Sequence, residues 1–107
     1  MAVRLTKPWL PRSEALAQLR GHLGVFELAD AEQNVVCIGF AGGKSPYGMK
    51  GEVAAALERF AKAQYVRVEI NTAYRTRHRE LLMAYIADHD RWPEFNEAFK
   101  LGRLSPA

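Results

Sequence analysis

The sequence predicts a small α+β domain, in which a largely antiparallel sheet of three strands opens with a β-hairpin and is flanked by helices. The two apolar segments 25–30 and 35–40 are joined by the turn-forming stretch 30–34, an arrangement typical of a β-hairpin. A third segment, 65–70, is rich in β-branched residues, and helical patterns precede and follow it.

The composition is that of one globular domain, with 107 residues of which 49% are hydrophobic and 25% charged. No run of about 18 apolar residues is present, so no membrane span is expected, and the first residues lack the apolar core of a secretion signal. Cys37 is the only cysteine, which excludes an internal disulfide and a cysteine zinc cluster. We therefore expect a cytoplasmic protein with an extended arm over 1–11, a single domain over 12–101 and a short tail over 102–107.

The N-terminal part is expected to contain an extended segment and one short helix. Residues 1–11 include two prolines, so we expect them to cross the surface with Trp9 as an anchor. Ser13 is a suitable N-cap for a helix over 14–20, and Gly21 is suited to end that helix.

Two longer helices are expected on either side of the third strand. Apolar residues at helical spacing and three consecutive alanines predict a helix over 49–64. A second helix is expected over 73–88, with Asn71 or Thr72 as its cap. After a break at a Trp-Pro pair, residues 94–101 are expected to form a last short helix.

The glycine-rich segment 41–48 invites comparison with a nucleotide-binding P-loop. Residues 43–45 match the end of the pattern G-x-x-x-x-G-K-[ST], but Ile38 stands where the first glycine should be. Pro46 also removes a backbone donor where the helix of a P-loop would begin. We therefore reject a P-loop, whereas a loop whose backbone N–H groups approach some anion remains open.

Two tripeptides in the hairpin, Gly24-Val25-Phe26 and Cys37-Ile38-Gly39, are followed in order by Glu80 on an apolar helix and by Pro93-x-x-Asn96. In this order they resemble the motifs of the GIY-YIG nuclease superfamily, over about two-thirds of the chain. The resemblance implies a structural role for Gly24, Gly39 and Asn96, with the Asn96 side chain bound to backbone near the site.

The resemblance also implies a metal-dependent mechanism. In such nucleases the glutamate, here Glu80, holds a magnesium or manganese ion that polarises the scissile phosphate. Tyrosines of the two tripeptides orient the attacking water, and an arginine neutralises the charge that develops on the phosphate.

This sequence departs from that pattern at the residues that would do the chemistry. Phe26 and Cys37 replace the two tyrosines, and neither supplies a phenolic hydroxyl. Lys50 is the closest match to the arginine and lacks its bidentate fork. Tyr47, or Tyr74, is a candidate replacement for a lost hydroxyl, although packing is the more common role of such a ring.

Candidate phosphate contacts lie in two places. Arg75, Arg77 and Arg79 crowd the start of the helix over 73–88, and Lys44 lies in the glycine-rich loop. The alternative is that these arginines form a solvated helix face, because the formal net charge of the chain is only +3.

Two functions are consistent with these residues. One is an endonuclease acting on DNA or RNA, with Glu80 as the ligand of magnesium or manganese. The other is a catalytically inactive module that keeps the fold and binds nucleic acid, a protein or a small ligand. For Glu80 itself the alternative is a surface position beside Arg77, one turn away on the same helix.

Overall fold

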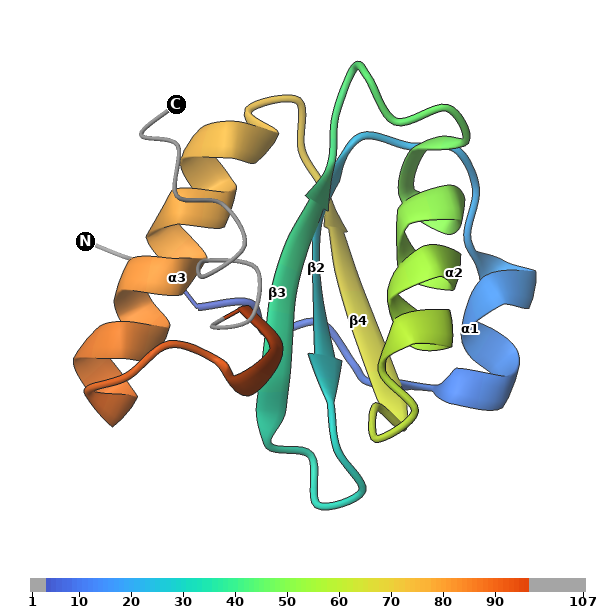
Figure 1. The fold of residues 1–107 in the computed structure, drawn as a ribbon. Helices are drawn as coiled ribbons and strands as arrows, with labels where there is room; N and C mark the ends of the chain where they lie inside the picture. The colour runs from blue at the N-terminus through green and yellow to red at the C-terminus, as the bar shows by residue number, and fades with distance from the viewer. Residues whose placement is uncertain (1–3, 97–107) are drawn as a thin grey trace.

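Four antiparallel strands form one sheet in the order β1-β4-β2-β3 in the computed structural model, which describes residues 4–96 (Figure 1). The elements follow the chain as β1 (Leu10–Pro11), α1 (Arg12–Gln18), β2 (Gly24–Ala29), β3 (Val35–Ala41), α2 (Gly48–Arg59), β4 (Tyr65–Ile70) and α3 (Tyr74–His89). The predicted α+β class and its opening hairpin are confirmed. The predicted sheet had three strands, and the fourth is the two-residue β1 at the end of the N-terminal arm.

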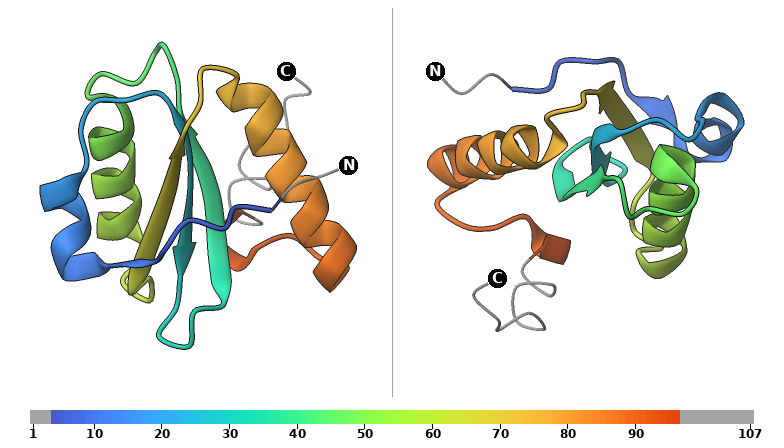
Figure 2. Two further views of the ribbon diagram at one scale, coloured as in Figure 1. Left: turned by 180° about the vertical axis from the view of Figure 1, so that it is seen from behind. Right: turned by 90° about the horizontal axis from the view of Figure 1, so that it is seen from above.

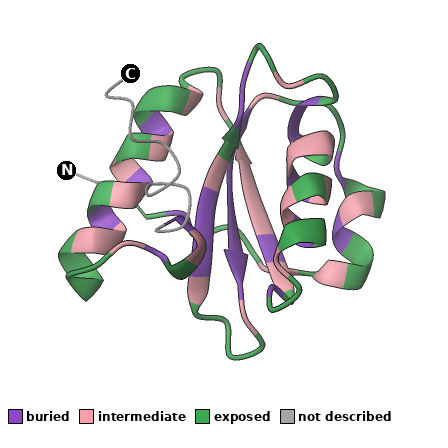
Figure 3. Ribbon diagram, viewed as in Figure 1, coloured by how far each residue is buried: buried purple, intermediate pink, exposed green. Residues whose placement is uncertain are grey.

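Helices cover the sheet on both faces. α1 and α2 lie on one face and α3 on the other, as the view from above shows (Figure 2). The larger core cluster lies between the sheet and the first two helices and contains Ala15, Leu19, Phe26, Met49, Val53 and Leu57. A smaller cluster under α3 contains Val25, Ile38 and Leu81. Because both faces are covered, all six residues of β2 are buried (Figure 3).

The N-terminal segment, residues 4–9, crosses the α3 face of the sheet before it enters β1 (Figure 2). Leu5 is 2% exposed and packs into the cluster under α3. Nε of Arg4 donates to Oδ2 of Asp88 near the end of α3 at 2.8 Å. The ring of Trp9 lies 4.0 Å from the guanidinium carbon of Arg67 on β4, so Trp9 anchors the segment as expected.

Several predicted element boundaries are wrong. α1 begins at Arg12 after Pro11, and Ser13 makes no capping bond. α2 ends at Arg59, five residues before the predicted end at residue 64, because the N–H of Gln64 already pairs with the Ala29 carbonyl of β2 at 2.7 Å.

The last helices differ from expectation in a similar way. α3 begins at Tyr74 after the N-cap residue Ala73. Asn71 does not cap it but accepts a hydrogen bond from the Ala73 N–H at 2.8 Å, which shapes the turn before the helix. Glu94–Asn96 are helical, and the rest of the helix predicted over 94–101, like the tail over 102–107, lies outside the described residues. Within residues 4–96 no helix has the length and apolar character needed to cross a membrane.

Candidate functional site

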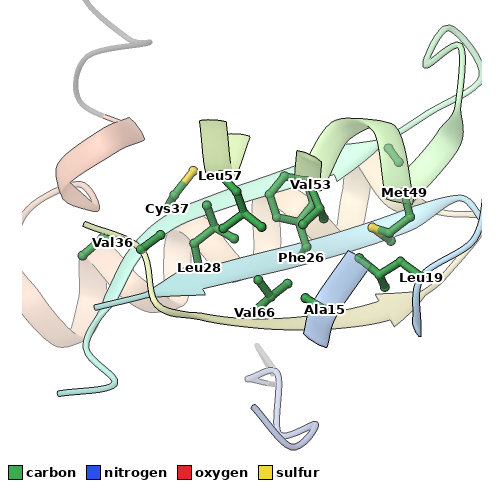
Figure 4. Close-up of a cluster of buried hydrophobic side chains, with 12 residues drawn as sticks. Ala15, Leu19, Phe26, Leu28, Val36, Cys37, Met49, Val53, Leu57 and Val66 are labelled. Carbon is green, nitrogen blue, oxygen red and sulfur yellow. The ribbon is translucent and has the colours of Figure 1, made fainter. Parts of the chain in front are cut away.

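Phe26 and Cys37 lie in the core beneath α2 and not at a surface site (Figure 4). Their side chains point to the same face because Leu28 pairs with Cys37 and Phe26 pairs with Gly39. Phe26 is 4% exposed and Cys37 is 2% exposed. This burial argues against a catalytic role for these two residues, because neither side chain reaches a substrate bound at the surface.

The glycines of the two tripeptides have steric roles. A Cβ atom at Gly39 would overlap the tip of the Phe26 ring, which lies across this position of β3. A Cβ atom at Gly24 would overlap the carbonyl oxygen of Glu69 on β4. Both glycines allow close approach within the sheet, so their presence is explained without reference to a reaction.

The thiol of Cys37 is expected to be unreactive in the folded protein. Burial raises its pKa to about 12, because the core disfavours the thiolate more than Arg59 stabilises it. We expect the native protein at pH 8 to react with a thiol reagent at least about 100-fold more slowly than the same chain in denaturant. Absorbance after addition of a disulfide reagent measures both rates, and equal rates would show that Cys37 is accessible.

Glu80 lies on α3 and is bound to an arginine. Oε1 of Glu80 accepts a hydrogen bond from Nη1 of Arg77 at 3.2 Å, and the Glu80 side chain is 45% exposed. Arg77 also donates two bonds to Glu69 of β4, at 2.7 Å from Nε and 3.1 Å from Nη2. A single guanidinium therefore lies between the two carboxylates.

Arg77 would compete with a divalent metal for the Glu80 carboxylate. Hydrogen bonding to Arg77 is the main cause that lowers the pKa of Glu69, and the same pair raises the pKa of Arg77. The positive charge that both carboxylates need is thus supplied by Arg77. Among the described residues, no three His, Cys, Asp or Glu side chains group as metal ligands would.

Arg77 is also poorly placed to contact a phosphate group. Its side chain is 9% exposed and is paired with Glu69 and Glu80, which argues against the predicted contact of Arg77 with substrate. Arg75 and Arg79 are exposed on the outer side of α3. The three arginines that are close in sequence therefore divide into one buried and two exposed side chains.

Asn96 binds the middle of β3. Its Oδ1 accepts from the N–H of Ile38 at 2.7 Å, and its Nδ2 donates to the Ile38 carbonyl at 2.8 Å. Nε2 of His78 lies 3.0 Å from the same carbonyl, and burial lowers the pKa of His78. The second tripeptide is therefore held through the backbone of its central residue.

The glycine-rich loop, residues 42–47, is held by bonds within the protein. The N–H of Gly42 donates to Oγ of Ser45 at 3.1 Å, and the N–H of Gly43 donates to the hydroxyl of Tyr74 at 3.0 Å. Oγ of Ser45 in turn donates to Glu52 on α2 at 2.7 Å. The N–H groups of Gly42 and Gly43 are therefore engaged within the protein and are not directed at a bound anion.

Cationic side chains gather around this loop. The N–H of Lys50, in the first turn of α2, donates to the carbonyl of Arg20 at 3.0 Å, which brings these two residues together. They border an open depression that is also lined by Tyr47 and by parts of the loop. Lys44 is exposed on the loop itself. We call Arg20, Lys44, Tyr47 and Lys50 the cationic loop surface.

The lysines of the cationic loop surface are not neutralised by carboxylates. No ion pair of Lys44 or Lys50 is found among residues 4–96. Arg20 donates to the carbonyl oxygens of Ala17 and Leu19 at the end of α1 and remains exposed. Of the predicted residues, Tyr47 and Lys50 line the same depression and Lys44 is exposed on the adjoining loop, whereas Glu80 lies on α3 across the sheet from α2 (Figure 1).

Sequence reasoning missed two members of this region. Arg20 precedes the hairpin by several residues, and only the pairing of its backbone with α2 places it beside Lys50. Phe40 is 36% exposed at the end of β3, and its ring stacks on that of Tyr74 at a centroid distance of 5.6 Å. The sequence signal that could have identified Phe40 is an aromatic residue directly before a glycine-rich loop.

The chain belongs to the family described as domain of unknown function DUF7508, whose model matches residues 3–88. The match includes both tripeptides, the cationic loop surface and Glu80. No curated protein and no solved structure matches the sequence.

Proposed function

We propose that this protein is a non-hydrolytic module that binds the phosphate backbone of nucleic acid at the cationic loop surface. The observation that carries the proposal is an open depression bordered by Arg20 and Lys50, with exposed Lys44 on the loop that forms part of its lining. Neither lysine has an ion pair among the described residues. Exposed cations that are not neutralised by carboxylates are the usual means of phosphate contact.

The positions of the altered motif residues support binding without hydrolysis. Phe26 and Cys37 are core residues, and the Glu80 carboxylate is occupied by Arg77. No motif hydroxyl is left to orient water, and a metal at Glu80 would have to compete with Arg77 for the carboxylate, so stabilisation of the transition state is weakened. Removal of one group that stabilises the transition state costs about 10² to 10³ in rate.

We also propose that the domain is a divergent relative of the GIY-YIG nucleases in the cytoplasm. The order hairpin, helix, strand, helix supports this, as does the contact of Asn96 with the second tripeptide. Such a relative keeps the motif glycines, which allow the strands to pack closely. It lacks the motif tyrosines, whose hydroxyls would take part in hydrolysis.

Binding tests the proposal directly. With labelled DNA or RNA, we expect Lys44→Ala and Lys50→Ala each to weaken binding, and the wild-type affinity to fall with salt at a log–log slope of about −2 to −3 for two or three phosphate contacts. Fluorescence anisotropy at several salt concentrations measures both quantities.

The matched control is Lys62→Ala, which removes the same charge from an exposed lysine that pairs with Glu94. This control is expected to leave the affinity within about 2-fold of the wild type. Equal effects of all three variants would show that net charge alone is measured, and this would contradict the proposal.

Hydrolysis is the alternative, and the half-exposed carboxylate of Glu80 favours it. The test uses excess protein with supercoiled plasmid or structured RNA and with magnesium or manganese, beside Glu80→Ala. We expect no cleavage by either protein. Cleavage by the wild type that Glu80→Ala abolishes would establish the nuclease function instead.

A further inference from the structure

We infer that the cationic loop surface takes an unpaired nucleic-acid strand in preference to a duplex, through base stacking on Tyr47 and Phe40. This inference rests on the proposed function and concerns the form of nucleic acid that the same surface accepts. It is based on two exposed aromatic rings that flank the glycine-rich loop, one on the α2 side and one on the α3 side.

Tyr47 supplies the ring on the α2 side. Its side chain is 77% exposed, although the residue sits at the fixed N-cap position of α2. The carbonyl of Tyr47 accepts from the N–H of Gly51, and a Cβ atom at Gly51 would be only 2.7 Å from the Cβ of Tyr47. The backbone is thus held while the ring is open to solvent beside Lys50.

Phe40 supplies the ring on the α3 side. It is 36% exposed and is supported from two directions, by Tyr74 at a centroid distance of 5.6 Å and by the edge of His78 at 5.0 Å. The Tyr74 hydroxyl accepts from the N–H of Gly43, which ties this aromatic group to the loop. Phe40 is therefore a fixed platform.

Two exposed rings on a surface that also carries lysines match an unpaired strand. The bases of a single strand offer free π faces, and stacking on an aromatic side chain adds to phosphate contacts without regard to sequence. The bases of a duplex already stack on one another, so a duplex gains only the contacts of the cations. Aromatic rings also lose little conformational entropy on binding.

The experiment compares a labelled strand of about 20 nucleotides, a length that exceeds common single-strand site sizes, with the blunt duplex of the same sequence. We expect the 107-residue protein to bind the single strand at least about 10-fold more tightly. Tyr47→Leu is expected to weaken single-strand binding about 5-fold or more and to leave duplex binding within about 2-fold.

Two further variants separate stacking from folding. Tyr47→Trp keeps an aromatic face and is expected to retain single-strand affinity, which a merely structural role of the tyrosine hydroxyl would not allow. Met83→Ala removes another exposed apolar side chain, 62% exposed on α3, and is expected to change neither affinity. Phe40→Leu is expected to act as Tyr47→Leu does, with the unfolding transition measured beside it.

The outcomes distinguish this inference from the function on which it rests. Equal affinity for strand and duplex, lowered by Lys44→Ala and unchanged by Tyr47→Leu, would overturn the stacking inference and leave phosphate binding standing. Absence of binding to either form at low salt would overturn both. A single-strand preference that Tyr47→Leu removes and Tyr47→Trp keeps would establish the inference.

Discussion

Replacement of Arg67 by methionine is expected to lower the free energy of unfolding by about 3–5 kcal/mol at pH 7, because it leaves a buried carboxylate without its partner. Glu27 lies on the central strand β2 and is 5% exposed. Its Oε1 accepts from Nε of Arg67 at 2.8 Å and from Nη2 at 2.7 Å. The substitution also removes the contact of the guanidinium with Trp9.

The loss of unfolding free energy in Arg67→Met, here called the deficit, should be larger at neutral pH than at acidic pH. Burial raises the pKa of Glu27 in the folded protein, and Arg67 opposes this shift. A carboxyl group with a raised folded pKa stabilises the fold below its unfolded pKa of about 4.3 and loses that contribution as pH rises through the folded pKa. Loss of Arg67 raises the folded pKa further, so the deficit should be largest near pH 7 and smaller near pH 4.

Urea unfolding followed by circular dichroism at pH 4 and pH 7 measures this deficit. Arg79→Met removes an exposed arginine and is expected to change the stability by less than about 0.5 kcal/mol. Addition of Glu27→Gln to Arg67→Met should recover part of the stability at pH 7, because the unpaired charge is removed. A deficit that is equal at both pH values would show that the buried charge is not its cause.

Replacement of Gly24 by alanine is expected to lower the free energy of unfolding by at least about 3 kcal/mol, which is more than the effect of an average substitution. The added Cβ would overlap the backbone oxygen of Glu69, and a backbone atom cannot turn aside as the tip of a side chain can. β2 and β4 must then separate, which strains the bond from the Asn71 N–H to the Leu23 carbonyl at 3.0 Å.

Gly43→Ala is the matched control for this substitution. A Cβ atom at Gly43 would meet only the Tyr74 hydroxyl at 3.7 Å, an ordinary contact distance. We expect Gly43→Ala to change the free energy of unfolding by less than about 0.5 kcal/mol, measured by urea unfolding followed by circular dichroism. A small effect of Gly24→Ala would contradict the steric explanation of the first tripeptide.

The parts of the fold that depend on local patterns could be predicted from the sequence. The hairpin followed from two apolar segments around a polar turn, and the strand over 65–70 was found with the bounds of β4. β1 could not be predicted, because Leu10–Pro11 become a strand only by pairing with Tyr65 and Val66. The early end of α2 likewise depends on a partner in β2.

The candidate site was harder to predict because its residues are placed by contacts distant in sequence. Arg77 has the same local setting as Arg75 and Arg79, and only β4 supplies the Glu69 that removes it from the surface. Phe26 and Cys37 stand in the two tripeptides that resemble a nuclease motif, but their burial depends on α2 lying over that face of the sheet. Lys44, Tyr47 and Lys50 were found together because they are close in sequence.

The contact between Asn96 and Ile38 also bears on association between copies of the chain. β3 is an edge strand, and edge strands offer backbone groups to which another strand can pair. The amide of Asn96 binds both the N–H and the carbonyl of Ile38, near the middle of β3, as the backbone of a neighbouring strand would. One side chain thus interrupts the only long open edge on this side of the sheet within residues 4–96, and it protects the protein from edge-to-edge aggregation.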